Sequence, residues 1–425
     1  MTPEAISKAG WRIVLLASLG GTLEFYDFVI FGVFAGDLAE AVFPARSPLV
    51  GLLQSYGAFA AGYLARPIGG IVLSHFGDRF GRRQVFLISL FAMSGATLAM
   101  GFVPTYAVWG AAASAAMVLL RVLQGFCIGG ELPGALTYVV ETAPKKAPLV
   151  CGVVFACVTM GVAVATAVSV GVRTFLPPDQ VAFYGWRIAF ILGGAGGVLS
   201  FVLRRKMEES PEFARMKALA ARQPFREVLQ SHRMPVVVGI GLLALTGGFN
   251  GLFFSHMPGY LSRVLGYDAR QAVVAATISV VVHAAMIFVV GWMASRISPR
   301  TLMRVGAAGL VLSGYPFYAA LAARPASPTL LLVGIGLIAG FVNGTYACLL
   351  TDLFPTRVRF SGVALAFNVA FTTFSGTAPL VATTLIRQFG TPVAPALILI
   401  GCGVLTLAAT FALPRHGGHV LGASG

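Results

Sequence analysis

The stretch "GDRFGRR", from Gly77 to Arg83, sets one acid and three arginines in a short polar break between two long apolar runs. Its two glycines let the chain turn tightly. We interpret Asp78, Arg79 and Arg82, together with Arg83, as a charge network that latches neighbouring helix ends. Ordinary solvated loop charge is the alternative. The apolar runs on either side then decide the fold class.

Those runs make the chain 57% hydrophobic and only 11% charged, with a mean hydropathy of +0.85. Soluble domains are about 25% charged, and an apolar helix of about 20 residues crosses a bilayer. The sequence therefore predicts an all-α integral membrane protein. Its twelve apolar segments are 12–34, 50–74, 84–103, 107–140, 149–172, 186–204, 234–257, 270–292, 302–322, 328–352, 361–385 and 391–413.

The basic residues indicate which side of the membrane is cytoplasmic. With a cytoplasmic N-terminus, 21 of the 30 Lys and Arg residues fall on the inner side and six on the outer side. Arg66, Arg121 and Arg187 lie within apolar segments or at their ends. This bias follows the positive-inside rule and accounts for the net charge of +15 without nucleic acid. We expect a multi-pass protein of the cell inner (plasma) membrane with both termini cytoplasmic.

The longest polar stretch, Arg204 to Arg233, divides the segments six and six. The fourth segment ends "YVVETAPKKAP" and the tenth ends "LLTDLFPTRVR". Glu141 and Asp352 stand 211 residues apart, each three residues before a proline, as in an internal duplication. We predict three parts: an N-terminal six-helix bundle (1–203), a cytoplasmic linker (204–233) and a C-terminal six-helix bundle (234–425).

Two acids, Glu24 and Asp27, lie one helical turn apart near the middle of the first segment. An ionised acid at that depth is costly, so each must be protonated, paired or facing water. Arg121 in "MVLLRVLQG" needs compensation too and is the natural partner. Arg121, Gln124 and Glu131 recur at helical spacing, and we expect this stripe to face the first segment across a polar cavity.

Other polar residues of the apolar segments are weaker candidates. Arg66 in "ARPIGG" either binds substrate or extends to the inner surface. Tyr26 either lines the cavity or packs between helices. Asn343 and Asn368 are candidate cavity groups. The histidines of apolar segments are interpreted as packing residues: His256 and His283.

The motif "GDRFGRR" resembles the loop signature of the major facilitator superfamily. "LEFYDF", "RPIGG", "RVLQGFCIGGE", "YGWRIAF", "RRKMEESPEF" and "LFPTRVRFSG" are similar to the metabolite:proton symporter family, which carries citrate, α-ketoglutarate, shikimate or proline/betaine. The resemblance implies 12 transmembrane helices in two pseudo-symmetric six-helix bundles around a central site. The second-half loop copy, "ASRISPR", has Ser295 at the Asp position. Arg296 and Arg300 could still pair with Asp352. We assign these three residues and Glu141 to the same inner-face charge network as the "GDRFGRR" residues.

The resemblance also implies a coupling role for the buried charges. Asp27 and Arg121 match the acid–arginine pair of related sugar–proton symporters, so we expect Asp27 to carry the proton and its protonation to free Arg121 for an anionic substrate. Glu24 and Glu131 would be secondary relay or substrate groups. The alternative is a static ion pair that holds two helices together.

The function expected from these residues is proton symport, by alternating access, that imports a small organic anion such as a carboxylate or keto acid. An importer of a zwitterion such as proline or betaine, and a proton-exchange exporter, remain as alternatives. We expect no metal and no cofactor, because the five cysteines lack ligand spacing and the proton gradient drives transport. No cluster of nucleophile and base suggests an enzyme. The expected partners are a small-molecule organic anion, protons and the lipid bilayer, with no nucleic acid, and we expect a monomer.

Overall fold

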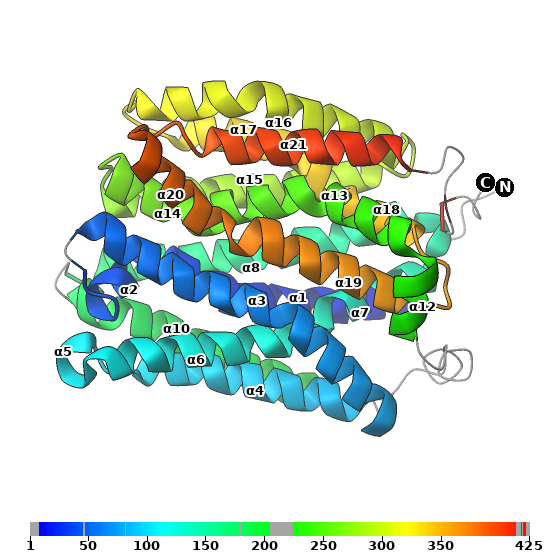
Figure 1. Ribbon diagram of the computed structural model, residues 1–425, viewed down its shortest axis with the longest axis horizontal. Helices are drawn as coiled ribbons and strands as arrows, with labels where there is room; N and C mark the ends of the chain where they lie inside the picture. The colour runs from blue at the N-terminus through cyan, green and yellow to red at the C-terminus, as the bar shows by residue number, and fades with distance from the viewer. Residues whose placement is uncertain are drawn as a thin grey trace.

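The computed structural model describes residues 8–45, 47–80, 82–177, 180–204, 224–413, 418 and 420–421. Throughout these residues the regular structure is helical, and the long helices run roughly along one axis (Figure 1). α1 (Lys8–Val33) begins and α21 (Ala396–Phe411) ends at the same end of the molecule. We call this the termini end, and the other the opposite end.

The first half of the chain forms one group of helices, which we call the N-terminal bundle. After α1 its elements are α2 (Ala35–Ala41), α3 (Pro48–Phe80), α4 (Arg82–Phe102), α5 (Tyr106–Trp109), α6 (Ala111–Ile128), α7 (Glu131–Thr142), η1 (Pro144–Lys146), α8 (Ala147–Phe175), η2 (Val181–Gly185) and α10 (Trp186–Arg204).

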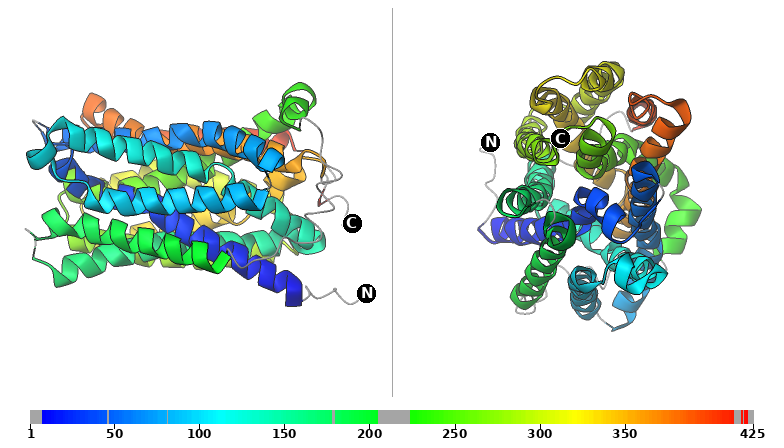
Figure 2. Two further views of the ribbon diagram at one scale, coloured as in Figure 1. Left: turned by 90° about the horizontal axis from the view of Figure 1, so that it is seen from below. Right: turned by 90° about the vertical axis from the view of Figure 1, so that its left-hand side faces the viewer.

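The second half forms the C-terminal bundle, and an end-on view separates the two groups (Figure 2). Before α21 its elements are α12 (Pro224–Ser231), α13 (Arg233–Asn250), η3 (Gly251–His256), α14 (Met257–Gly259), η4 (Tyr260–Val264), α15 (Ala269–Met293), α16 (Pro299–Ala322), α17 (Thr329–Asn343), α18 (Tyr346–Asp352), α19 (Arg359–Ala370), η5 (Phe371–Gly376) and α20 (Ala378–Phe389).

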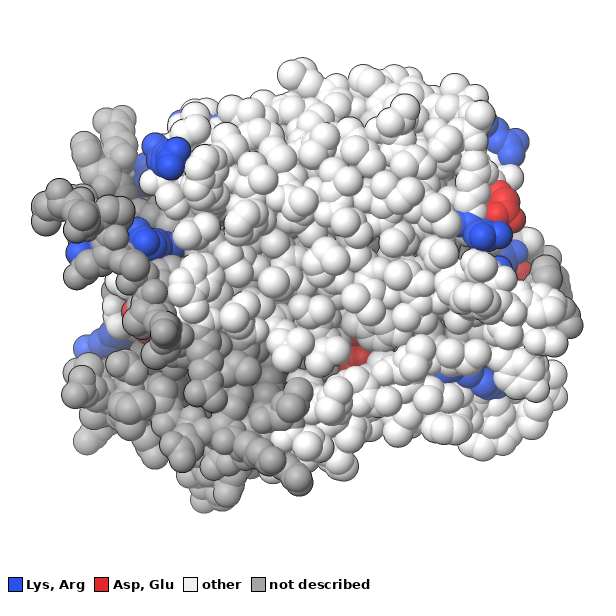
Figure 3. Space-filling view, turned by 180° about the vertical axis from the view of Figure 1, so that it is seen from behind, with Lys and Arg blue, Asp and Glu red and all other residues white. Residues whose placement is uncertain are grey.

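Most of these helices are long and apolar enough to cross a bilayer. Among the described residues eight spans meet that test by length and composition, and the bent pair Ser18–Val33 and Ala35–Ala41 makes a ninth. The shorter apolar helices Leu87–Phe102 and Ala396–Phe411, together with α3, complete the twelve segments that the sequence predicts. One face of the molecule accordingly shows Lys and Arg at its two ends and an almost uncharged belt between them (Figure 3).

The two bundles meet along α1, α3, α7 and α8 on one side and η3, α15, α19 and η5 on the other. α8 and α15 approach most closely at two glycines. A methyl group added at Gly152 would lie 2.7 Å from the Cα atom of Gly291. Small residues permit this backbone approach between membrane helices, and it brings the polar groups of both halves within reach of one another.

Two π-helical turns lie where the bundles touch. η3 of the C-terminal bundle packs against α1, and η5 packs against α3. π-Helical turns are uncommon and occur most often at functional positions. Their location draws attention to the residues of α1 and α3 that they face.

Candidate functional site

Arg121 of α6 is fully buried in the N-terminal bundle. Its Nη2 donates to the carbonyl oxygen of Phe28 at 2.9 Å, and its Nη1 donates to Oε1 of Gln124. The Phe28 ring lies 3.9 Å from the guanidinium carbon. Arg121 Nε has no hydrogen-bond partner among the described residues. The cation is therefore held by the α1 backbone, by Gln124 and by aromatic faces, and its Nε remains without a partner among the described residues.

Asp27 does not form the predicted ion pair with Arg121. Both of its carboxylate oxygens lack a hydrogen-bond partner within the described part of the chain, although the residue is 1% exposed. Gln124 stands between the two groups, since its Nε2 donates to the Asp27 carbonyl oxygen at 3.0 Å and to Thr97 Oγ1 at 2.8 Å. The Asp27 side chain turns instead toward Gly193 of α10.

Arg66 of α3 is 1% exposed, so it does not extend to the surface. Its Nε and Nη2 lack hydrogen-bond partners among the described residues. Aromatic rings from both bundles surround its guanidinium carbon at centroid distances of 5.2–5.8 Å: Phe28, Tyr63, Phe367 and Phe371. A second buried cation therefore lies at the interface between the bundles.

Hydrogen bonds cross the interface close to Arg66. Tyr63 Oη and Ser375 Oγ are 3.1 Å apart, and Thr372 Oγ1 donates to the Tyr63 carbonyl oxygen at 2.7 Å. Asn368 Nδ2 donates to the Gly129 carbonyl oxygen at 2.5 Å, while its Oδ1 lacks a partner in the described residues. Asn368 thus lies at the interface, with an unused acceptor.

Asn343 lies inside the C-terminal bundle, in a network that joins α13, α15 and α17. Its Nδ2 donates to Asn250 Oδ1 at 3.1 Å and lies 3.0 Å from His283 Nε2. His283 Nδ1 is 2.7 Å from the Gly336 carbonyl oxygen, which can only accept. The proton therefore sits on Nδ1 and Nε2 accepts from Asn343. This agrees with the interpretation of His283 as a satisfied packing residue.

The other predicted site residues of the first half of the chain, Tyr26, Glu24 and Glu131, lie within the N-terminal bundle. Tyr26 Oη donates to the Ala189 carbonyl oxygen of α10 at 2.9 Å, so this side chain packs within the bundle rather than at the interface. Glu24 is 2% exposed, and Glu131 begins α7, where it is buried. Glu131 acts electrostatically on Asp27.

The "GDRFGRR" motif lies at the termini end, where the sequence predicts a loop. α3 instead continues to Phe80 and α4 already begins at Arg82. The side chains of the predicted network in this motif lie outside the described part of the structure: Asp78, Arg79, Arg82 and Arg83.

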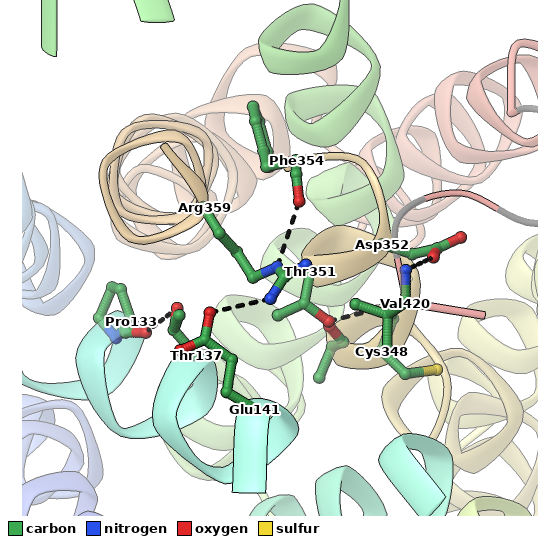
Figure 4. A network of polar contacts seen from close by, with 10 residues as sticks. Pro133, Thr137, Glu141, Cys348, Thr351, Asp352, Phe354, Arg359 and Val420 are labelled. Carbon is green, nitrogen blue, oxygen red and sulfur yellow. Dashed lines mark hydrogen bonds and ion pairs between the residues drawn. The ribbon is translucent and has the colours of Figure 1, made fainter. Parts of the chain in front are cut away.

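The predicted termini-end residue Glu141 does join the two bundles. Its Oε1 lies 2.8 Å from Nη1 of Arg359, which is 4% exposed at the start of α19 (Figure 4). Arg359 Nε also donates to the Phe354 carbonyl oxygen at 3.1 Å. Arg359 stands in the quoted motif "LFPTRVRFSG", but its spacing gives no signal that it rather than Arg357 faces the other bundle.

Asp352 does not pair with Arg296 or Arg300 in the described structure. Arg296 instead stacks on the Trp292 ring at 4.5 Å. The Asp352 carboxylate instead accepts hydrogen bonds of 2.7–2.8 Å from backbone N–H groups near the end of the chain. One of these bonds appears in Figure 4. The donors are Gly418, Val420 and Leu421.

A second charge cluster, absent from the sequence-based expectations, lies at the opposite end. Asp37 pairs with Arg173 within the N-terminal bundle, and Glu40 pairs with Arg263 of η4 at 2.5 Å. Asp37, Arg173 and Arg263 line a cavity of about 250 Å³. The acids in the short helix "AGDLAEA" are the available sequence signal. The ion pair Glu40–Arg263 joins the bundles at the opposite end, as Glu141–Arg359 joins them at the termini end.

The fold and these buried charges define a class: polytopic membrane transporters built from two helical bundles around a central polar site. The sequence profile of the Major Facilitator Superfamily matches residues 17–378. The chain belongs to this superfamily, as the resemblance in its motifs predicts.

Two curated relatives span nearly the whole chain. It is 30% identical over 94% of its length to a "putative proline/betaine transporter" of Staphylococcus aureus (strain MSSA476), of which it covers 87%. It is also 30% identical over 96% of its length to the "citrate-proton symporter" of Klebsiella pneumoniae, of which it covers 94%. Both relatives are transporters rather than enzymes.

A solved structure has the same fold. The proton:xylose symporter XylE, bound to 6-bromo-6-deoxy-D-glucose, superposes with a TM-score of 0.77 and 18% identity, with 99% of each chain covered. This likeness shows the fold alone. Together with the twelve helical segments, it confirms the predicted architecture of two six-helix bundles.

Proposed function

We propose that this transporter imports a small organic anion, a carboxylate or keto acid, together with protons by alternating access. The observation that carries the proposal is the pair of buried guanidinium groups, Arg66 and Arg121. Three of their nitrogens have no hydrogen-bond partner among the described residues. Unmet donors on buried cations are costly, so a bound carboxylate would stabilise this arrangement. The name of the citrate–proton relative supports the same substrate class.

Proton coupling would run through Asp27. When Asp27 is protonated it carries no charge that attracts Arg121, and the free Nε of Arg121 is then available to substrate. When Asp27 is ionised, Coulomb attraction draws Arg121 toward it and weakens the hold on the anion. Glu131, which acts electrostatically on Asp27, would relay the proton. Glu24 would be a second relay or substrate group, and no resident cofactor is needed.

A zwitterion is the second candidate, and the rings around Arg66 favour it. Aromatic faces bind quaternary ammonium groups, and a relative is named as a putative proline/betaine transporter. In this case the carboxylate would bind Arg121, while the ammonium would take the place of the Arg66 head group among Phe28, Tyr63 and Phe371.

Uptake into proteoliposomes with an acidic exterior tests these proposals. We would offer labelled citrate, α-ketoglutarate, shikimate and betaine to the wild type, Asp27→Asn and Arg66→Gln, with and without a protonophore. Arg387→Gln, an exposed arginine on α20, is the matched control. We expect the protonophore and Asp27→Asn to abolish accumulation of a carboxylate, and Arg66→Gln to lower its uptake at least roughly tenfold, the loss of one charged hydrogen bond.

The possible outcomes separate the candidates. Accumulation of betaine alone would favour the zwitterion importer. A substrate flux that is unchanged by the protonophore and by Asp27→Asn would make the chain a uniporter and contradict coupling through Asp27. Proton-driven flux in the opposite direction would identify an exporter.

We further propose a location in the inner (plasma) membrane, cytoplasmic termini, a monomer, and domains at 1–203, 204–233 and 234–425. The bias of basic residues toward the termini side supports the orientation. Labelling of single cysteines at residues 2 and 424 by an impermeant thiol reagent in spheroplasts would contradict cytoplasmic termini.

A further inference from the structure

The carboxyl of Asp27 occupies a space that two glycines of α10 leave open. A methyl group added at Gly193 would lie 2.5 Å from Asp27 Oδ1, and one added at Gly197 would lie 3.3 Å from Oδ2. The same methyl group at Gly197 would also collide with Ser94 of α4. A side chain at Gly193 would therefore displace the carboxyl and also meet the Tyr26 ring, at 2.7 Å, whereas one at Gly197 would crowd the carboxyl and displace Ser94.

The chemistry of the space suits a neutral acid. Asp27 is 1% exposed, and its two oxygens have no hydrogen-bond partner among the described residues. The hydroxyl of Ser94 already donates to the Leu90 carbonyl oxygen, and that of Thr97 to the Met93 carbonyl oxygen. Such surroundings make an ionised carboxylate costly and a protonated one tolerable.

Charged groups on other helices also act on Asp27. Arg121 of α6 and Glu131 of α7 act on it electrostatically, with opposite signs. α4 and α10 carry charge only near their ends, and α8 carries none between Ala147 and Val172. Glu24 and Tyr26 lie on α1 itself. The elements packed against α1 carry further titratable residues: Asp37 and Glu40 of α2, Tyr56, Tyr63 and Arg66 of α3, Cys127 of α6, Glu141 of α7, the cysteines of α8 and His256 of η3.

We infer that Gly193 and Gly197 of α10, together with Ser94 of α4, form the seat in which Asp27 is held in its protonated form, apart from Arg121. We call these three residues the Asp27 seat. The inference rests on the proposed role of Asp27 as proton carrier. It adds Gly193, Gly197 and Ser94 as positioning residues for Asp27. Because the two glycines have no side chains, α10 leaves room for the acid to turn away from Arg121.

Infrared titration of the purified transporter tests the seat without any substrate. The carbonyl stretch of the protonated Asp27 carboxyl is assigned by subtracting the spectrum of the matching Asp27→Asn variant. In Gly193→Ala the added methyl group takes the place of the carboxyl, and in Gly197→Ala it crowds the carboxyl and Ser94, so we expect both changes to disfavour the protonated form held there. We expect the pH at which half of the band is lost to fall by about one unit, a tenfold change in proton affinity.

Two neighbouring glycines of the same helix are matched controls. Gly196→Ala meets only Leu23, at 3.5 Å. Gly194→Ala would come within 2.6 Å of Leu98 and crowds the α4–α10 packing without touching Asp27. Both should leave the titration midpoint unchanged.

The controls decide what each result means. An unchanged midpoint in Gly193→Ala and Gly197→Ala, or an equal shift in Gly194→Ala, would overturn the seat. A wild-type Asp27 band that is absent at every pH would overturn it too. The infrared titration uses no substrate, so it tests the Asp27 seat alone. Absence of proton-driven uptake by the wild type in proteoliposomes would contradict the proposed function and leave the titration result standing.

Discussion

Gln124 connects three groups through one side-chain amide. Its oxygen accepts from Arg121, and its nitrogen donates to the Asp27 carbonyl oxygen and to Thr97. Arg121 is therefore positioned by a neutral group and not by an acid. A neutral acceptor holds a cation more weakly than a carboxylate does, which leaves Arg121 able to exchange partners.

Replacing Gln124 by Glu should trap Arg121. A carboxylate of the same shape would form a charged hydrogen bond worth about 1.5–3 kcal/mol, so the fraction of molecules with a releasable Arg121 should fall roughly ten- to hundredfold. We expect uptake of monodisperse protein in proteoliposomes to fall by that factor. Thermal stability should fall as well, because a carboxylate cannot replace the two hydrogen bonds that Gln124 Nε2 donates to the Asp27 carbonyl oxygen and to Thr97. Gln230→Glu, the same change at an exposed position of α12, should transport normally. Wild-type uptake by Gln124→Glu would show that Arg121 does not need to be released.

At the scale of helices, the sequence predicts most boundaries closely. The segments 84–103 and 270–292 match α4 (Arg82–Phe102) and α15 (Ala269–Met293) within two residues, because the bilayer dictates the length of an apolar run. The breaks were not predictable. The single run 107–140 becomes three helices, and the segment 234–257 continues through π-helical turns to Val264, since local backbone geometry leaves no mark on hydropathy.

The direction of a buried side chain was harder to predict than the helix that carries it. Asp27 and Arg121 each needed compensation within an apolar segment, which suggested a pair. The pair is absent because Gly193 and Gly197 offer Asp27 a space on another side of α1, and the sequence does not say which helix packs there. For the same reason Asn343 was assigned to the cavity, whereas its partners are His283 and Asn250.

At the scale of the whole molecule, contacts join the two bundles at both ends. Glu141–Arg359 closes the termini end and Glu40–Arg263 closes the opposite end. The first pair is nearly buried, whereas the side chains of the second are 55% and 35% exposed. Exposed pairs contribute at most about 1 kcal/mol. Separation of the bundles would therefore meet the larger electrostatic barrier at the termini end.

Breaking the Glu141–Arg359 pair should open that end. Loss of one partner of a buried pair costs about 3–5 kcal/mol, so Glu141→Gln should increase hydrogen–deuterium exchange at the end of α7 and the start of α19. Reversing both charges, Glu141→Arg with Arg359→Glu, should restore part of the protection.

A neighbouring arginine provides the control for this experiment. Arg357 pairs with Glu227 at 3.2 Å, at the same end, but both residues belong to the second half of the chain and the arginine is exposed. Arg357→Gln should leave exchange at α7 unchanged. Equal exchange in Glu141→Gln and the wild type would mean that the pair does not hold the bundles together.

The aromatic surroundings of Arg66 bear on how the chain is made. Phe367 and Phe371 of this group are synthesised long after α3 has left the ribosome. Until then an arginine near the middle of a lone span costs about 2.5–3.5 kcal/mol at the translocon. We expect chains truncated after α3 to insert incompletely in a glycosylation-mapping assay, and Arg66→Leu to correct this in truncated but not in full-length chains. Complete insertion of the truncated wild type would contradict this. The buried Arg66 therefore opposes membrane insertion of the early chain, and its surroundings are complete only when the second bundle has been synthesised.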